Sequence, residues 1–373
     1  MSIADVALID SHCHGVRTDD LADDAFRALA TESDWLSLPG TETLDSPVGI
    51  AIRARCASLL DLERHAPIER YLERRRELGA PEVNRRLMTA GRYGGFLIDT
   101  GYGAEDVLDP DGMAGSFDAR SWEIVRLERV AESIAPVTTA DGFAADFRAA
   151  LASAGERAVG FKSIMAYRAG LDLPATPPPA SEVRLAAEAW LRRDGASGSY
   201  RIDHPVLLAH LVWAAVEHRK PIQFHIGFGD SDVRLDRSDP SRLTAFLRAT
   251  RTSGASIMLL HCYPFIREAG ALAHIFPHVH LDVGEVSHYT GPSAIATVRE
   301  SLEIAPFTKV LFSSDAYGLP ELYYVSASSW RAAMTRITNE WLAEDWLSVA
   351  DAERLVELVA AGNARRVYGL EAA

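Results

Sequence analysis

Two histidines, His12 and His14, are separated by one residue and lie shortly after the apolar run 6–9. Such a run is typical of a buried parallel strand. In a strand, side chains two positions apart lie on the same face, so both imidazoles can contact one metal ion. The alternative is a pair of hydrogen-bonded histidines in a turn. The spacing alone leaves both interpretations open, and the rest of the chain has to decide between them.

Four further residues with metal-binding side chains end other predicted strands, namely Lys162, His225, His261 and Asp315. Each has an ordinary interpretation by itself: a histidine there is often a structural residue, an aspartate often caps a helix, and a lysine often forms an ion pair. In a barrel of parallel strands, however, the carboxyl ends of all strands meet at one rim. The six residues together therefore predict a metal centre.

The strands that would position these residues are mostly separated by helical patterns. They are predicted at residues 6–11, 95–99, 122–128, 158–163, 221–225, 256–261, 279–283 and 310–314. Eight such units in one chain of 373 residues predict an α/β fold, the (β/α)8 TIM barrel. A doubly wound open sheet is the alternative, but no Gly-x-Gly-x-x-Gly motif follows a strand to support it.

The first connection is far longer than a βα loop requires. Residues 18–92 contain several helical patterns, and we expect them to form a helical insertion after the first strand. Because βα loops lie over the catalytic face of a barrel, the insertion would cover the site as a lid. Near the other end, Gly362 and Asn363 are expected to end a helix. We expect residues 1–373 to form a single domain.

Composition restricts the class of protein. The chain has 48% hydrophobic and 24% charged residues, which is typical of a soluble globular protein. Its net charge of −14 argues against nucleic acid or an anionic membrane as a partner. No signal-peptide pattern or transmembrane-length apolar run is present. Cys13, Cys56 and Cys262 are too irregularly spaced for a disulfide framework, so we expect a cytoplasmic protein. We expect its partner to be a small-molecule substrate.

The order His-x-His, Lys, His, His, Asp resembles that of the amidohydrolase superfamily of metal-dependent barrels. Similar local segments are Leu8-Ile-Asp-Ser-His-Cys-His14, Leu259-Leu-His-Cys262, Phe312-Ser-Ser-Asp-Ala316 and Gly362-Asn-Ala-Arg-Arg-Val-Tyr-Gly369. The last two resemble the amidohydrolase-2 branch. Segments 160–168 and 315–321 also resemble the amidohydrolase half of nodulin/glutamine-synthetase-like fusion proteins.

The resemblance implies a role for each residue of the predicted centre. His12, His14 and Asp315 would hold a first metal ion, and Asp315 would also act as general base and then general acid. His225 and His261 would hold a second ion if Lys162 is carboxylated and bridges both. In single-metal relatives, the residue at position 225 completes the first site and the residue at 261 acts directly on the substrate. Such ligands suit Zn²⁺, or Mn²⁺ at a carboxylate-rich binuclear site, and make a hydroxide nucleophile available near neutral pH.

Several residues just after the strands are candidates for substrate binding. They are Arg126, Tyr167, Arg168, Glu285, His288 and Tyr317, with Tyr102 as a further rim residue. An arginine near a barrel mouth is a suitable anchor for a carboxylate, because its planar fork binds two oxygens at once. The alternative for each arginine is an ordinary ion pair. Two arginines would fit a small acidic substrate, and the resemblance to the fusion proteins would suggest a γ-glutamyl amide.

Three functions therefore compete. The first is a metal-dependent hydrolase of a C–N (amide-like) or ester bond. The second is a non-oxidative decarboxylase, because the amidohydrolase-2 branch includes single-metal decarboxylases. The third is a catalytically silent barrel, which predicts missing ligands, whereas all six are present. Related barrels often form homo-oligomers, but the sequence does not define an interface.

Overall fold

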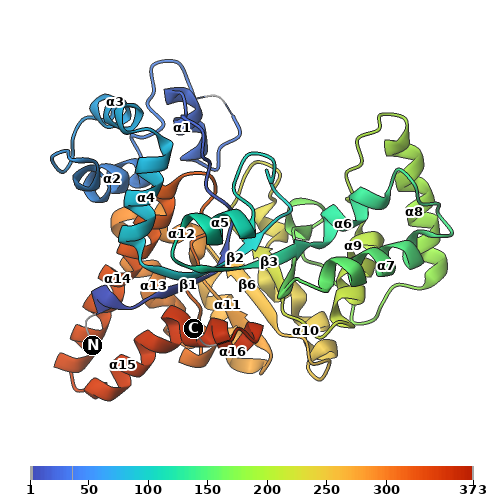
Figure 1. The fold of residues 1–373 in the computed structure, drawn as a ribbon. Helices are drawn as coiled ribbons and strands as arrows, with labels where there is room; N and C mark the ends of the chain where they lie inside the picture. The colour runs from blue at the N-terminus through green and yellow to red at the C-terminus, as the bar shows by residue number, and fades with distance from the viewer. Residues whose placement is uncertain (1–2, 36, 372–373) are drawn as a thin grey trace.

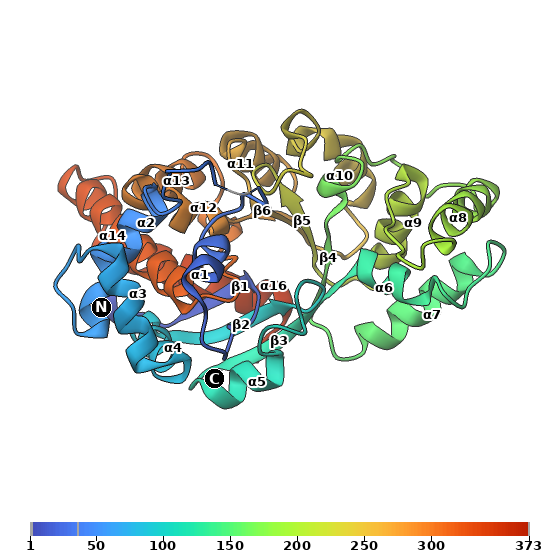
Figure 2. The same ribbon diagram turned by 90° about the horizontal axis from the view of Figure 1, so that it is seen from above.

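A ring of parallel strands forms the centre of the fold in this computed structural model, which describes residues 3–35 and 37–371. Within those residues a seven-stranded sheet runs in the order β1 to β7, each strand pairing with the next along the chain. The strands are β1 Leu8–Cys13, β2 Tyr93–Asp99, β3 Arg120–Arg126, β4 Gly160–Ser163, β5 Ile222–Ile226, β6 Ile257–His261 and β7 Val279–Leu281. Seen from above, helices surround these strands (Figure 2).

The eighth predicted strand, 310–314, lies between β7 and β1 but forms only a single β-bridge, from Val310 to Leu281. Leu311 N donates to Leu281 O on one side, and Ser11 N donates to Phe312 O on the other. The segment therefore closes the ring as a TIM barrel requires. It does not become a regular strand because donors after Leu311 leave the ladder, as when Ser314 N donates to the Asp10 side chain. Phe312 N likewise donates to Val359 O.

Side chains that alternate in direction along each strand form two separate apolar layers. On β6, Ile257 and Leu259 belong to the large cluster between strands and helices, whereas Met258 and Leu260 belong to a smaller cluster inside the barrel. This is the period of two that a strand imposes. Tyr368 of α16 (Asn363–Tyr368) packs into the inner cluster. Helix α16 lies at the opposite end of the barrel from α1 (Figure 1).

The insertion after β1 is helical, as the sequence predicts. It contains α1 Asp23–Leu29, α2 Pro47–Arg55, α3 Ile68–Leu78 and α4 Ala80–Gly91. Ser46 caps α2 by accepting a hydrogen bond from Gly49 N, and Pro47 occupies the first turn, where its missing N–H has no cost. Figure 2 shows α1 above the ring of strands. The insertion therefore covers the end of the barrel at which the strands finish.

The remaining helices lie outside the strands. They are α5 Pro110–Ser116, α6 Leu127–Ile134, α7 Phe143–Gly155, α8 Ala180–Gly195, α9 Pro205–Val216, α10 Thr244–Thr250, α11 Ile266–Ile275, α12 Gly284–Tyr289, α13 Ala294–Ser301, α14 Pro320–Ala343 and α15 Val349–Glu357. Helices α7, α8 and α9 lie together on one side of the barrel (Figure 1). Among the helices described, we find none with the length and apolar character needed to cross a bilayer.

Two sequence predictions of local structure were wrong. The third strand ends at Arg126 rather than at 128, because Leu127 and Ala131 follow helical spacing and are buried together on α6. Gly362 and Asn363 do not end a helix, since Asn363 begins α16 and the left-handed cap is Gly369, with φ 64°. The Asn363 amide instead donates to Val310 O and Phe307 O, which holds the closing segment in place.

Candidate metal centre

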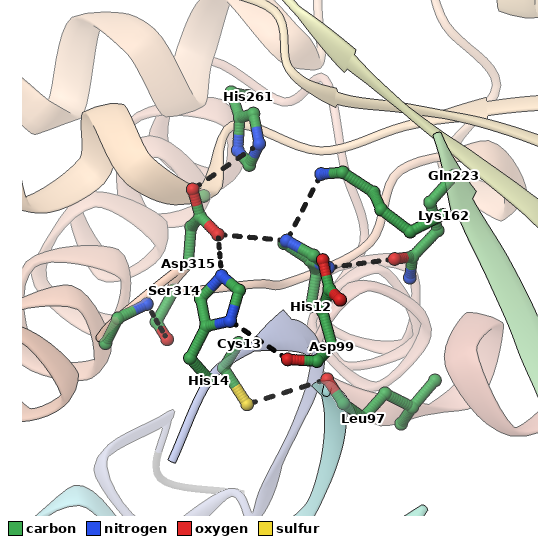
Figure 3. Close-up of polar contacts among 12 residues, drawn as sticks. His12, Cys13, His14, Leu97, Asp99, Lys162, Gln223, His261, Ser314 and Asp315 are labelled. Atoms are coloured by element: carbon green, nitrogen blue, oxygen red, sulfur yellow. Dashed lines mark hydrogen bonds and ion pairs between the residues drawn. The ribbon is translucent and has the colours of Figure 1, made fainter. Parts of the chain in front are cut away.

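The carboxylate of Asp315 contacts three imidazoles at the carboxyl end of the barrel (Figure 3). Asp315 Oδ1 lies 2.9 Å from His12 Nε2 and 3.6 Å from His14 Nε2. Its Oδ2 lies 3.4 Å from His261 Nε2. His12 lies on β1, His14 directly follows β1, His261 ends β6, and Asp315 follows the closing segment. Elements far apart in the sequence therefore bring four of the six predicted residues into one cluster.

The other two residues of the predicted centre lie beside this cluster. Lys162 Nζ on β4 is 3.3 Å from His12 Nε2, and its side chain points toward His12 (Figure 3). The His225 ring on β5 has its centroid 4.7 Å from that of His261. All six side chains therefore meet at one place, as the barrel topology predicts, although their individual roles remain predictions.

Two histidines of the centre are oriented by hydrogen bonds to their far nitrogens. His12 Nδ1 donates to Gln223 Oε1 at 2.8 Å, and His14 Nδ1 donates to Asp99 O at 3.1 Å. The Gln223 amide can only present its oxygen, because its Nε2 donates to Ser11 O. These bonds leave both Nε2 lone pairs directed at the centre, which is the arrangement that metal-binding histidines use.

The donor set fits a divalent metal ion. Nε2 of both His225 and His261 is buried and has no hydrogen-bond partner among the described residues. Unsatisfied buried nitrogens are costly, and a metal ion would satisfy them. Donors of His12, His261 and Asp315 lie within 4.8 Å of one another, as do those of His12, His14 and Asp99. Arg126 already binds the Asp99 carboxylate, at 2.6 Å, so we favour the set that contains Asp315.

Burial keeps His12, His225 and His261 neutral. It lowers the pKa of His12 to about 4 and that of His225 to about 3, and nearby Lys162 acts in the same direction on both. Burial also lowers the pKa of His261 well below its ordinary value. Neutral imidazole is the form that binds a metal. Near neutral pH these side chains are therefore ready to act as ligands.

Two residues of the centre have unusual backbone conformations. His261 has φ 65° and Asp315 has φ 51°, both in the left-handed region that non-glycine residues rarely adopt. Buried carboxylates hold the chain at these points: Asp282 Oδ1 accepts from His261 N at 2.8 Å, and Asp10 Oδ1 accepts from Ser314 N at 2.8 Å. Such outliers gather at functional sites, where the surrounding structure fixes them.

A cavity of about 980 Å³ opens above the centre. It is bordered by His12, His14, Lys162, His225 and Asp315, and by Arg27, Leu29, Thr31 and Glu32 from the insertion. Residues of the insertion therefore form part of the cavity wall, as expected for a long first βα loop.

Four of the six predicted substrate-binding residues line this cavity: Arg126, Tyr167, Arg168 and Tyr317. The other two, Glu285 and His288, are not among its described lining residues. Both are buried, and His288 Nδ1 lies 3.0 Å from Ser326 Oγ. The structure therefore places them in the packing around the site.

The two arginines expected to hold a carboxylate each contact a carboxylate of the protein. Arg126 binds Asp99 at 2.6 Å, and Arg168 Nη2 lies 3.5 Å from Glu132 Oε1. Arg168 nevertheless keeps Nε and Nη1 without hydrogen-bond partners among the described residues. Arg168 thus has unpaired donors and borders the cavity.

Sequence reasoning did not identify several residues of the site. Gln223 and Asp99 orient histidines, and Glu32, Tyr289 and Arg201 line the cavity. The end of β2 could have indicated Asp99, because polar residues at strand ends reach the barrel rim. Glu32 lies in the irregular segment after α1, where no periodic pattern indicates the direction of a side chain.

A model of the amidohydrolase-2 family, described as Amidohydrolase, matches residues 121–370. The chain belongs to the amidohydrolase family. The fluG protein of Emericella nidulans is 31% identical over 223 residues, which cover 57% of this chain and 26% of that protein. The chain thus spans about a quarter of the length of this relative.

A solved structure supports the same assignment. A protein of Lactobacillus casei ATCC 334, named for a proposed metal-dependent hydrolase activity, has a TM-score of 0.85 and 28% identity, covering 98% of this chain and 96% of that chain. A uronate isomerase of Bacillus halodurans C-125 has a TM-score of 0.61 and 16% identity over 99% and 95% of the two chains. The likeness to the isomerase concerns the fold alone. The chain thus has the barrel of this family, and its strand ends bring together side chains that fit a divalent metal ion.

Proposed function

We propose that this amidohydrolase is a metal-dependent hydrolase that cleaves a C–N (amide-like) or ester bond of a small substrate. The observation that supports this function best is the Asp315 carboxylate among His12, His14 and His261, below an open cavity. A bound divalent metal would supply a Lewis acid for the scissile carbonyl and lower the pKa of water toward neutrality. Zn²⁺ suits these nitrogen and oxygen donors, and Mn²⁺ is the alternative.

In this proposal Asp315 accepts the proton of the attacking water. Burial works against the ionised carboxylate, but His261 and His12 hold the pKa of Asp315 well below its ordinary value. Asp315 therefore stays ionised at neutral pH and is able to accept a proton. Gln223 and the Asp99 carbonyl keep the imidazoles of His12 and His14 in position while this occurs.

We further propose that Lys162 is carboxylated and helps to hold a second ion with His225 and His261. Among the described residues, Lys162 Nζ forms no ion pair with a carboxylate, and its hydrogen-bond partner is His12. Burial lowers the pKa of Lys162, which increases the fraction of neutral amine. The neutral amine is the form that adds to carbon dioxide. Both features support a modified lysine here.

The substrate in this proposal is a small molecule that bears a carboxylate, with a γ-glutamyl amide as one candidate. Arg168 supports the carboxylate, because two of its guanidinium nitrogens lack partners and it borders the cavity. Tyr167 packs against His225 with ring centroids 4.3 Å apart and would contact the same substrate. We also propose a cytoplasmic location, which the three buried, unpaired cysteines support.

A product assay tests this function directly. The metal-loaded protein would be incubated with amides, γ-glutamyl amides, esters and aromatic carboxylic acids, and released amine, alcohol and carbon dioxide would be measured. We expect release of amine or alcohol, and no release after treatment with a chelator. Release of carbon dioxide alone would instead identify the decarboxylase. No turnover of any compound by fully loaded protein would contradict both.

A further inference from the structure

Arg168, which follows β4, is a buried cation with unused hydrogen-bond donors. Its side chain is only 10% exposed, and it lines the cavity above the metal centre. Its Nε and Nη1 have no hydrogen-bond partner among the described residues. A buried donor without a partner is costly, and a charged donor is more so. The position of Arg168 therefore suits an anionic ligand.

Glu132 on α6 satisfies Arg168 only in part. Glu132 Oε1 lies 3.5 Å from Arg168 Nη2, whereas a strong charge-assisted hydrogen bond measures about 2.7–2.9 Å. The same oxygen accepts a hydrogen bond from Ile202 N at 3.1 Å, and Ile202 lies in the segment between α8 and α9. Glu132 thus holds this segment beside Arg168 and leaves the other guanidinium nitrogens of Arg168 available.

Arg201 brings a second guanidinium group to the same place. Arg201 Nη2 donates to Tyr167 O, the carbonyl directly before Arg168, at 3.4 Å, and Arg201 also lines the cavity. Its backbone is fixed, because Arg201 N donates to Asp194 Oδ2 at 2.9 Å. Burial, and after it the positive charge of Arg201, lowers the pKa of Arg168. Two like charges therefore lie close together at the cavity wall, and an anion bound to both would relieve their repulsion.

An aspartate contacts Arg201 from the loop after β5. Asp232 Oδ2 lies 2.7 Å from Arg201 Nη2, and the two side chains are 53% and 48% exposed. Ion pairs this exposed contribute little to stability, because water screens them. Arg201 can therefore exchange Asp232 for the carboxylate of a ligand at a small cost.

The arginine pair is separate from the metal centre. In the described part of the chain, neither Arg168 nor Arg201 forms a hydrogen bond or ion pair with any of the six residues of the centre. Their contacts lie on the side of the barrel that carries α6, α8 and α9 (Figure 2). Tyr167 adjoins both places, because its carbonyl accepts from Arg201 and its ring packs against His225. One ligand can therefore extend past Tyr167 from the arginines to the metal centre.

We propose that Arg168 and Arg201 together bind a carboxylate of the substrate that does not itself react. This inference rests on the proposed function, to which it adds a second arginine and a class of substrate. The substrate is an acid that carries its scissile amide or ester bond elsewhere in the molecule, at the metal centre. A carboxylate suits the pair, because its two oxygens can accept from two guanidinium groups at once.

Binding of dicarboxylates tests the arginine pair without turnover. Succinate, glutarate and adipate would be titrated into the metal-loaded protein by isothermal titration calorimetry, since one carboxylate can bind metal while the other binds the arginines. We expect Arg168→Gln to raise the Kd of the tightest ligand by about 10–100-fold, the effect of losing a hydrogen bond to a charged group. Arg201→Gln, which changes a more exposed side chain, should raise it by a smaller factor.

The matched control for both variants is Arg184→Gln. It removes the same charge from an exposed arginine of α8 that is not among the described lining residues of the cavity, and it should bind like wild type. An unchanged Kd in either Arg168→Gln or Arg201→Gln would overturn the proposal. Failure of wild type to bind any of the three dicarboxylates would also overturn it.

Replacing Asp232 with asparagine should give a gain that misfolding cannot produce. Because Asp232 competes with the ligand for Arg201, we expect Asp232→Asn to lower the Kd by about two- to fivefold. The gain should vanish when Arg201→Gln is combined with Asp232→Asn. A gain that persists in the double variant would overturn the role of Arg201.

Kinetics separate this proposal from the proposed function. A substrate from the product assay would be compared with its analogue in which a carboxamide replaces the carboxylate. We expect Arg168→Gln to raise KM for the acid with kcat nearly unchanged, because the anchor binds substrate and transition state alike, and to change neither for the carboxamide. Equal losses on both compounds would overturn the proposal. Dicarboxylate binding that depends on the arginines, without turnover of any compound, would contradict the proposed function alone.

Discussion

Replacing Asp315 with asparagine is expected to lower kcat by at least about 10²–10⁴-fold, the usual contribution of a general base. An amide of the same shape cannot accept the proton of the attacking water. It would also place an NH₂ group or a weaker oxygen donor 2.9–3.6 Å from His12 and His14. Steady-state kinetics with a substrate from the product assay, at fixed metal concentration, measure the effect.

Asp24→Asn is a suitable control for Asp315→Asn. Asp24 is an exposed carboxyl of α1 at the outer part of the same cavity, and its contact with Arg27 is 4.0 Å long. We expect this variant to retain wild-type kcat. If Asp315→Asn kept kcat within about tenfold of wild type while binding metal normally, Asp315 would not be the base.

Replacing Arg126 with alanine is expected to reduce the free energy of unfolding by about 3–5 kcal/mol, because it leaves a buried carboxylate without its partner. Asp99 is fully buried and Arg126 nearly so, and the guanidinium donates through Nε and Nη2 to the carboxylate. Urea denaturation at pH 7 measures the loss. Arg126→Lys keeps the charge but not the planar fork, so its free energy of unfolding should fall less than that of Arg126→Ala.

The effect of Arg126→Ala should depend on pH. Burial by itself raises the pKa of Asp99, but Arg126, with His14 and His12, lowers it well below the ordinary value. Stability from a carboxylate with a lowered folded pKa is present above its unfolded pKa, about 4, and is lost as pH falls below it. The difference between wild type and variant should therefore be largest near pH 7 and shrink below about pH 4. A loss under about 1 kcal/mol at pH 7 would mean that Arg126 is free for a substrate carboxylate.

The six residues of the centre were predictable from sequence because strand ends and topology suffice to locate them. His12 and His14 follow an apolar run, and His225 and His261 each end one, so the parallel barrel brings them together. The same reasoning predicted the helical insertion. This prediction requires only that the strands and helices are recognised, and an error of a few residues in their ends does not change it.

Partners of side chains were harder to predict. The role of Gln223 depends on whether its amide faces His12, and that depends on Ser11 O, which accepts from its NH₂ group. Glu32 lies in an irregular segment, where the position of a residue in the sequence does not indicate the direction of its side chain. The pairing of Arg126 with Asp99 arises because β2 and β3 are neighbours, with Asp99 opposite Ile124. Such contacts between elements carry no local sequence signal.

A count of bound metal ions tests whether His12 and Lys162 belong to a metal centre. Protein purified without chelator would be measured by inductively coupled plasma mass spectrometry as wild type, His12→Ala, Lys162→Ala and, as control, His274→Ala, which changes an exposed histidine on α11. We predict about two ions per chain in wild type and control, and fewer in both site variants. One ion, lost only in His12→Ala, would contradict the bridging lysine and favour the decarboxylase. No metal in wild type, even after reconstitution, would contradict the metal centre itself.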